Sequence, residues 1–364
     1  MKNKYFKIFE TCTLVKGIVR SGICDLQRGN FKTIPDGMYS IIENFKHSSY
    51  QDVINKYGAD SKDIIKEYVD WLIDNEFGFW CDKEDFNNFP ELETKWESPL
   101  LITNAILDVE YPSDIDYLQV IRQLIELRVR HIQIRSFKAV NFSFYLSLIE
   151  LCEGSRINTI DIITPFVENN QINISDLIIN KKRLLRVNTI IIYNSSEERI
   201  LEGEDGMTSI NYVKEKITND NCCGKISPLF FSVNLSTYTE SLNYNTCLNR
   251  KISIDVNGKI KNCPSMQKSY GNINDTTLEE ALNKEGFKDV WHIKKDDIKI
   301  CQDCEFRHIC TDCRAYIDNP KDIYSHPAKC TYNPYQAKWK GEEDYVPVTE
   351  MTKKEIEQIK AEYA

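Results

Sequence analysis

Residues 301–313 read Cys-Gln-Asp-Cys-Glu-Phe-Arg-His-Ile-Cys-Thr-Asp-Cys, and this stretch decides the class of the protein. Its spacing is Cys-x2-Cys-x5-Cys-x2-Cys, and the same third of the chain adds a Cys-x10-Gly-x4-Cys motif upstream and one more cysteine downstream. Thiols gathered this densely either form disulfides or bind metal. The whole set is Cys247, Cys263, Cys301, Cys304, Cys310, Cys313 and Cys330.

The bulk properties favour a cytoplasmic protein with reduced thiols. The segment 1–7 lacks the apolar core of a secretory signal. Apolar runs such as 185–193 are far shorter than a membrane span. Because cytosolic thiols stay reduced, metal binding is expected rather than disulfides. A net charge of −9 argues against nucleic acid as a general partner.

Two metal chemistries suit these thiols. Cys-x2-Cys pairs are standard zinc ligands. Two pairs only five residues apart are tighter than the usual zinc ribbon spacing, however, and seven thiols do not divide into complete four-cysteine sites. Iron–sulfur clusters tolerate short Cys-x2-Cys steps and incomplete cysteine ligation. The pattern therefore favours iron–sulfur clusters, with zinc as the alternative.

The segment between Cys247 and Cys263 predicts a β-hairpin. Asn257-Gly258 separates two alternating runs, which predicts a type I′ turn with positive φ at both residues. Such a hairpin brings Cys247 and Cys263 together at its open end.

Residues 98–235 alternate strands and helices, which predicts a parallel sheet with right-handed crossovers. An open, partial β/α barrel fits this order, and a doubly wound sheet is the alternative. The expected strands are 100–107, 131–135, 157–163 and 187–193, and the expected helices are 114–127, 144–152 and 175–184.

The motif Cys-x3-Cys-x2-Cys, which holds the cluster that cleaves S-adenosylmethionine, is absent from the chain. In a barrel of that type it would lie in the loop after the first strand, here residues 108–113, and this loop has no cysteine. Cleavage of S-adenosylmethionine needs one iron left open by three thiolates. We therefore expect neither that chemistry nor bound S-adenosylmethionine.

Residues 1–82 predict the order β-β-β-α-α-α-β. The expected strands are 14–20, 23–26, 31–33 and 78–80, and the expected helices run from Pro35 to Phe45, from Ser49 to Gly58 and from Asp60 to Asn75. This order resembles the winged-helix-like recognition domain that opens many peptide-maturation enzymes; an unrelated small α+β domain is the alternative. In that family a leader peptide adds a strand to the sheet edge and packs against a helix. Residues 86–97 are expected to form a linker.

The cysteine spacing resembles the SPASM domain, the twin-cluster module of radical S-adenosylmethionine (radical SAM) peptide-modifying enzymes. Residues 245–266 and 301–316 are most similar to one subgroup, the SPASM-domain peptide maturase of grasp-with-spasm systems. These systems make ribosomally synthesised modified peptides (RiPPs), and they encode the maturase beside an ATP-grasp ligase and a short precursor peptide. The chain resembles a member that lacks the radical SAM motif.

This resemblance implies an α/β protein of four parts. They are a winged-helix-like leader-peptide recognition domain at 1–82, a degenerate partial β/α barrel at 98–235, a SPASM iron–sulfur domain at 240–335 and a C-terminal tail at 336–364. It also implies two 4Fe–4S clusters. Cluster one would be held by Cys247, Cys263 and Cys313, and cluster two by Cys301, Cys304, Cys310 and Cys330. The fourth position of cluster one would be open to water, a peptide group or another side chain.

Some residues lie outside this assignment or depart from the family pattern. Only two residues separate Cys310 from Cys313, where the common pattern has three. The neighbouring thiols Cys222 and Cys223 either cover a cluster face, coordinate weakly or are incidental. Four further cysteines are expected to be free buried thiols, namely Cys12, Cys24, Cys81 and Cys152. Candidates to offset cluster charge are Arg307 and Arg314. His308 and His326 are expected to be ordinary polar residues near the clusters; the alternative is that either donates to a cluster sulfide or stands in as a ligand.

Three functions follow from these expectations. In the first, the chain is a peptide-maturation protein that binds leader and core peptide and carries auxiliary clusters, while an ATP-grasp ligase forms the bonds. In the second, it is a stand-alone iron–sulfur enzyme that modifies the peptide at an open cluster site. In the third, it is a zinc-stabilised scaffold. The first explains why a recognition domain and clusters would persist without the radical site.

Overall fold

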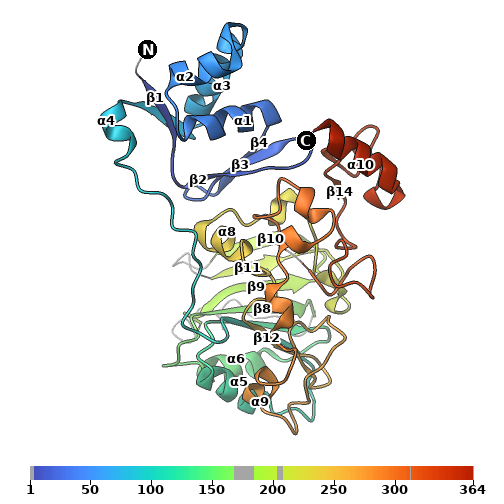
Figure 1. The fold of residues 1–364 in the computed structure, drawn as a ribbon. Coiled ribbons are helices and arrows are strands. Elements are labelled where there is room, and N and C mark those ends of the chain that lie inside the picture. The colour runs from blue at the N-terminus through green and yellow to red at the C-terminus, as the bar shows by residue number, and fades with distance from the viewer. Residues whose placement is uncertain (1–3, 168–183, 203–207, 312, 364) are drawn as a thin grey trace.

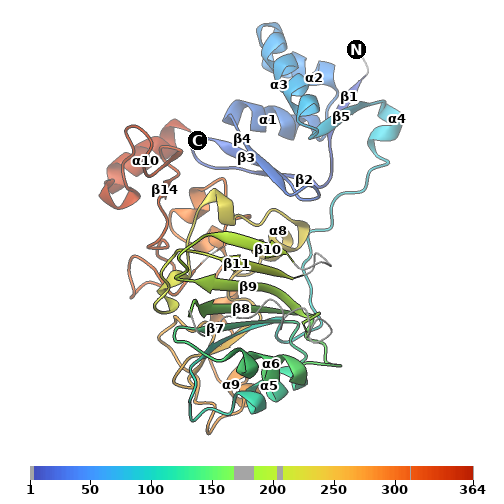
Figure 2. The same ribbon diagram turned by 180° about the vertical axis from the view of Figure 1, so that it is seen from behind.

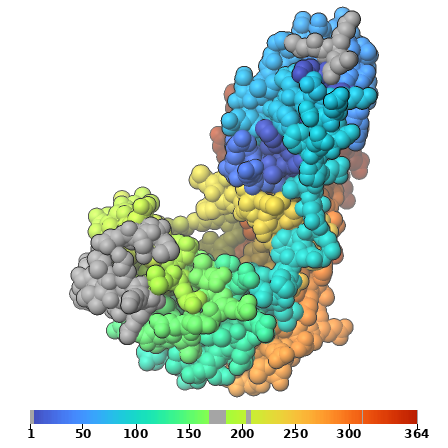
Figure 3. Space-filling view, turned by 90° about the vertical axis from the view of Figure 1, so that its left-hand side faces the viewer, coloured from blue at the N-terminus to red at the C-terminus, as the bar shows by residue number. Residues whose placement is uncertain are grey.

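The computed structural model describes residues 4–167, 184–202, 208–311 and 313–363. A small N-terminal unit lies at one end of the molecule and a large sheet at the other (Figure 1). The last helix, α10 (Lys353–Glu362), returns to lie beside the N-terminal unit (Figure 2). A hollow opens between the central strands and the segment around α8 (Leu235–Ser241) (Figure 3). Within the described residues, no helix combines the length and the apolar character needed to cross a bilayer.

The N-terminal unit has two small antiparallel sheets and a group of helices. β3 pairs with β2 and with β4, and β1 pairs with β5. The predicted order of strands and helices is confirmed, with β1 and the short α4 as additions. The elements are β1 (Tyr5–Ile8), β2 (Cys12–Val15), β3 (Ser21–Asp25), β4 (Asn30–Ile34), α1 (Asp36–Phe45), α2 (Tyr50–Tyr57), α3 (Lys62–Asp74), β5 (Gly78–Cys81) and α4 (Lys83–Phe86).

β2 ends earlier than the sequence predicts. The expected strand runs on to Arg20, whereas β2 ends at Val15. The backbone N–H of Ile18 donates instead to the carbonyl of Asp303, in the cysteine-rich segment, at 2.9 Å. A contact between residues so far apart in the chain leaves no local signal, so the strand was predicted too long.

Both ends of α2 follow from local signals. The side chain of Ser49 accepts a hydrogen bond from the N–H of Asp52, and the Asp52 carboxylate accepts one from the N–H of Ser49. These two bonds satisfy donors that the first turn of a helix leaves open. At the other end, Gly58 has φ of 90°, which a residue with a Cβ rarely adopts. Val53 and Ile54 on the inner face are buried.

We expect Ser49→Ala to lower the free energy of unfolding by about 1 kcal/mol, because an N-cap hydroxyl typically contributes that much. Urea denaturation of the two proteins measures the difference. Ser61→Ala is the matched control, since Ser61 precedes α3 without making a side-chain cap bond. Equal losses from the two substitutions would contradict the role of the cap.

The central sheet has eight strands in the order β10-β11-β9-β8-β7-β6-β12-β13. The strands from β6 to β9 are parallel and follow one another in chain order, so the predicted parallel sheet is confirmed. β11 continues the parallel arrangement, and the edge strands β10 and β13 are antiparallel to their neighbours. The strands are β6 (Asn104–Val109), β7 (His131–Ser136), β8 (Thr159–Pro165), β9 (Val187–Tyr193), β10 (Arg199–Glu202), β11 (Ser209–Tyr212), β12 (Lys251–Ile254) and β13 (Ile260–Lys261).

Strand β12 joins the cysteine-rich segment to this sheet. It runs parallel to β6, with Ile252 opposite Ala105 and Ile254 opposite Leu107. All four of these side chains belong to the main hydrophobic core. The hairpin that carries the first cysteines is therefore a continuation of the central sheet.

Two helices cover the sheet at its lower end in Figure 1, α5 (Tyr117–Glu126) and α6 (Phe142–Leu151). Their buried faces share one core with the strands and with α9 (Leu278–Leu282). Each fully buried aliphatic side chain in such a core contributes about 1.5–3 kcal/mol. The predicted helix at 175–184 falls almost entirely outside the described residues.

The N-terminal unit rests on the cysteine-rich segment through a buried carboxylate. Glu305 is 1% exposed, and it accepts hydrogen bonds from Arg20 Nε at 2.7 Å and from the Tyr332 hydroxyl at 2.5 Å. Tyr332 begins β14 (Tyr332–Asn333), which pairs with β15 (Lys338–Trp339). The aromatic ring of Phe31, on β4, packs against Phe306 with 5.7 Å between centroids. The predicted recognition unit is thus in direct contact with the predicted metal-binding segment.

Candidate metal centre

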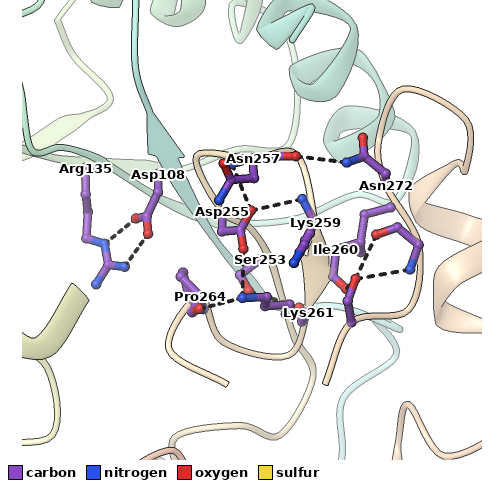
Figure 4. Close-up of polar contacts among 12 residues, drawn as sticks. Asp108, Arg135, Ser253, Asp255, Asn257, Lys259, Ile260, Lys261, Pro264 and Asn272 are labelled. Carbon is purple, nitrogen blue, oxygen red and sulfur yellow. Dashed lines mark hydrogen bonds and ion pairs between the residues drawn. The ribbon is translucent and has the colours of Figure 1, made fainter. Parts of the chain in front are cut away.

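The predicted hairpin is present, but its turn differs from the expectation. Among the described residues, Gly258 has positive φ (77°) and Asn257 does not, so the predicted type I′ turn is wrong. The Asp255 carboxylate accepts from the N–H groups of Asn257 and Lys259, at 2.9 and 3.0 Å (Figure 4). The Asp255 side chain therefore stabilises this turn, whereas the sequence predicted a type I′ turn defined by the backbone dihedral angles of Asn257 and Gly258. A Cβ at Gly258 would lie 2.8 Å from Asn272 Oδ1, so a larger residue there would displace the Asn272 side chain and would be strained by the positive φ.

Three of the predicted thiols come together beside the hairpin. Lys251 Nζ lies 3.5 Å from Cys247 Sγ. Burial raises the pKa of Cys263 to about 11, and the nearby Cys247 thiolate adds to the rise. Burial also raises the pKa of Cys313 to about 12, with further contributions from Cys247 and Cys263. The structure therefore groups the three residues assigned to cluster one, including the one that follows the shortened Cys-x2-Cys step.

The other four thiols line a single cavity. They are Cys301, Cys304, Cys310 and Cys330. The buried Lys295 places its Nζ 3.8 Å from Cys301 Sγ and 3.6 Å from Cys310 Sγ. Burial raises the pKa of Cys330 to about 11, and the Cys310 thiolate adds to this rise. These are the residues assigned to cluster two.

Aromatic side chains surround the cluster-two thiols. Phe231, Phe306, Tyr332 and Trp339 line the same cavity. The Tyr332 ring lies 4.8 Å from Trp339 and 5.1 Å from Phe306, measured between centroids. The backbone N–H of Phe306 donates to Cys304 Sγ at 3.4 Å. A low-dielectric shell with amide hydrogen bonds to sulfur is the kind of environment that tunes thiolate-bound clusters.

A lysine supplies positive charge at each of the two sets of cysteines. The sequence alone did not predict these lysines. Lys251 is four residues after Cys247 and Lys295 is six residues before Cys301, and neither spacing is a recognised signal. The two arginines that were expected to offset cluster charge have other hydrogen-bond partners. Arg307 Nε donates to an aspartate at 2.8 Å, and Arg314 donates to two backbone carbonyls.

The remaining candidates have ordinary structural surroundings. His308 Nδ1 lies 3.1 Å from Ser241 Oγ, and burial lowers the pKa of His308 to about 4, so the ring is neutral at pH 7. His326 Nδ1 lies 3.2 Å from Asp318 Oδ2. All thirteen cysteines are free thiols, and the prediction that Cys12, Cys24, Cys81 and Cys152 are buried is confirmed.

A buried ion pair lies at the end of β6, where the loop 108–113 begins. Asp108 is near the end of β6, and Arg135 on β7 donates to it from Nε at 2.6 Å and from Nη2 at 2.9 Å (Figure 4). Both side chains are buried. A cavity of about 450 Å³ adjoins the pair. Lys261 lies on its wall and contacts Asp255 Oδ2 at 2.7 Å and the Pro264 carbonyl at 3.1 Å.

Comparison with known families identifies one part of the chain. Residues 246–305 match the model of the SPASM family, an iron-sulfur cluster-binding domain. This SPASM match includes four of the seven clustered cysteines, namely Cys247, Cys263, Cys301 and Cys304. No curated protein matches the chain.

Solved structures with a distant similarity include three of SuiB from Streptococcus suis. SuiB bound to S-adenosylmethionine is 10% identical, with a TM-score of 0.34, over 85% of this chain and 96% of SuiB. SuiB bound to the precursor peptide SuiA is 11% identical, with a TM-score of 0.32, over 88% and 98%. SuiB alone is 10% identical, with a TM-score of 0.30, over 85% and 96%.

The donor set suits an iron–sulfur group. The grouped side chains are thiols in buried or partly buried surroundings, with amine and amide donors directed at sulfur. In the part of the chain that the structure describes, no three His, Cys, Asp or Glu side chains converge on a point that would hold a single metal ion.

Proposed function

We propose that this chain is a SPASM-type peptide-maturation protein that carries two 4Fe–4S clusters. Cluster two would be held by Cys301, Cys304, Cys310 and Cys330, and cluster one by Cys247, Cys263 and Cys313. The observation that supports this proposal is that these seven thiols, all buried or partly buried, lie in two groups in and next to the segment that matches the iron-sulfur cluster-binding domain. One of the two groups lines a single cavity.

The proposed protein performs no radical SAM chemistry and binds no S-adenosylmethionine. The central sheet would be a degenerate partial β/α barrel, in which β6 to β9 form the wall in chain order. At the end of β6 the Asp108–Arg135 pair lies where such a barrel needs a cluster with an open iron. The loop 108–113 offers no thiol to bind one.

The N-terminal unit, a winged-helix-like recognition domain, would bind the leader of a precursor peptide. A cavity of about 350 Å³ lies beside the edge strand β2. Its lining includes Cys12, Thr13 and Leu14 of β2 and Ile42 and Phe45 of α1, together with residues of β1 and of the linker 86–97. An extended peptide can add to such an edge through main-chain hydrogen bonds while its side chains enter the groove. The residues of this groove would therefore bind and orient the peptide.

The bond-forming step would belong to a partner of a grasp-with-spasm system, an ATP-grasp ligase in the same cytoplasm. In this arrangement the N-terminal unit holds the leader. The cavity of about 450 Å³ beside Asp108 and Lys261 is available to the core peptide. The clusters are auxiliary, which means that they would supply structure or electron transfer. The chain's own residues would bind and orient the precursor peptide.

Metal and sulfide analysis tests the cluster proposal. The chain, purified without oxygen, should contain about eight iron and eight sulfide ions, four of each per cluster. Cys301→Ala should remove the iron of cluster two, whereas Cys152→Ala, at a buried thiol far from both groups, should remove none. Stoichiometric zinc without labile sulfide would overturn the proposal and leave the zinc-stabilised scaffold.

Enlarging the groove wall should weaken leader binding. We expect Leu14→Trp to reduce the affinity for a fluorescent leader peptide at least about tenfold, equivalent to about 1.4 kcal/mol, because the larger ring fills the cavity beside β2. Titration by fluorescence anisotropy measures the change, in the absence of S-adenosylmethionine. Ile64→Trp is the matched control, since Ile64 lies on α3 and is 45% exposed. Unchanged binding by the Leu14 variant would place the leader elsewhere.

A further inference from the structure

A short loop, residues 219–224, reaches the cluster-one thiols from outside the recognised motif. Two side chains that follow cluster-one cysteines in sequence hold its first half. Tyr316 donates its hydroxyl to the Asp220 carbonyl at 3.2 Å. Ser265 donates to the same carbonyl at 3.4 Å. The loop is therefore attached to both halves of the cysteine-rich segment.

The second half of the loop is held equally closely. Lys329 Nζ donates to the carbonyls of Asn221 and Cys223, each at 2.6 Å. Gly224 has φ of 80°, and a Cβ on it would lie 3.1 Å from the Sγ of Cys313. The backbone next to Cys223 therefore passes close to a cluster-one sulfur, and a side chain at Gly224 would be strained by the positive φ and crowded by Cys313.

The Cys223 side chain has a charged partner. Arg135 Nη1 donates to Cys223 Sγ at 2.8 Å, while the other side of the same guanidinium binds the Asp108 carboxylate. Arg135 is fully buried. The ion pair at the end of β6 and β7 therefore extends to a sulfur atom, and it holds that atom in one orientation.

We propose that Cys223 supplies the fourth thiolate of cluster one and completes the set Cys247, Cys263 and Cys313. The proposal rests on the iron–sulfur function proposed above. It accounts for the fourth position that the recognised motif leaves open. It also explains why the loop 219–224 is attached at so many points to residues next to cluster-one cysteines.

The geometry selects Cys223 over its neighbour Cys222. Cys222 ends the short 3-10 helix Asp220–Cys222, and Cys223 follows it with an extended backbone, φ −75° and ψ 164°. Arg135 binds the sulfur of Cys223, and Lys329 binds its carbonyl, so this is the residue held at the cluster-one group. Cys222 offers a matched control one residue away.

Complete ligation has a functional consequence. A cluster with four protein thiolates has no iron open to substrate, so cluster one would serve in structure or electron transfer. That role agrees with a peptide-binding partner protein and argues against a stand-alone enzyme that uses an open iron.

The test compares Cys223→Ala and Cys222→Ala in the full chain, purified without oxygen. Iron and sulfide are quantified, and the reduced protein is examined by electron paramagnetic resonance (EPR) before and after addition of cyanide, a small ligand that binds open iron. In the wild type and in Cys222→Ala, we expect about eight irons and a spectrum that cyanide does not change.

In Cys223→Ala we expect either a cluster-one signal that shifts with cyanide or a fall to about four irons, with the cluster-two signal retained in both cases. A Cys223→Ala spectrum identical to that of the wild type in both conditions would overturn the assignment, as would the expected changes appearing in Cys222→Ala instead. Absence of iron and sulfide from the wild type is a separate result, which would overturn the proposed function itself.

Discussion

Asp108→Asn should lower the free energy of unfolding by about 3–5 kcal/mol, the usual loss when one partner of a buried ion pair is removed. The substitution keeps the shape of the side chain but leaves the guanidinium of Arg135 buried without a carboxylate. Both residues are almost fully inaccessible, and the pair makes two hydrogen bonds of 2.6 and 2.9 Å. Urea denaturation, followed by far-ultraviolet circular dichroism, measures the change.

A neighbouring pair provides the control. Lys138 contacts Glu110 across the same two chain segments, beyond the ends of β6 and β7, but its side chain is 69% exposed. Exposed ion pairs contribute about 0–1 kcal/mol, so Glu110→Gln should change stability little. If the double substitution Asp108→Leu with Arg135→Met restores much of the stability, the loss in Asp108→Asn came from the buried, unpaired charge of Arg135. A loss of less than about 1 kcal/mol in Asp108→Asn would mean that water reaches Arg135, contrary to its burial.

The elements found from the sequence are those with local causes. The capping box of Ser49, the glycine at position 58 and the amphipathic helices of the N-terminal unit depend on residues a few positions apart. The parallel order of β6 to β9 follows from the same logic, since strands separated by helices pair in parallel. The cysteine spacing likewise marks a metal-binding segment without any knowledge of the fold.

The features that were missed depend on distant pairs. β12 pairs with β6 although some 150 residues separate them in the chain, and nothing near either strand indicates the partner. Arg135 reaches Cys223 from a strand 88 residues earlier. Such contacts are created by the fold and have no fixed spacing.

The turn at Asn257-Gly258 differs from the expected type for a local reason. Asp255, two residues before Asn257, supplies a carboxylate acceptor that a rule based on the dipeptide ignores.

Glu305→Ala should loosen the attachment of the N-terminal unit to the cysteine-rich segment. The carboxylate is 1% exposed and accepts from Arg20 Nε and from the Tyr332 hydroxyl. Hydrogen bonds to charged groups contribute about 1.5–3 kcal/mol each. A loss of about 2 kcal/mol would raise the population of the detached unit by about thirtyfold. The linker 86–97 should then be cleaved faster by a protease at low concentration, by roughly the same factor.

Asp70→Ala is the matched control, because Asp70 pairs with Lys66 on the exposed side of α3. It should leave the cleavage rate within about twofold, as expected for a pair worth less than about 0.5 kcal/mol. Iron and sulfide, measured in the same samples, separate detachment from loss of cluster two, since Glu305 directly follows Cys304. If the linker of the Glu305 variant is cleaved no faster while the clusters are retained, the aromatic contacts around Phe306 hold the two parts together without the carboxylate. The N-terminal unit would then be fixed to the cysteine-rich segment by apolar packing, and the leader peptide of the proposed function would be held at a constant distance from that segment.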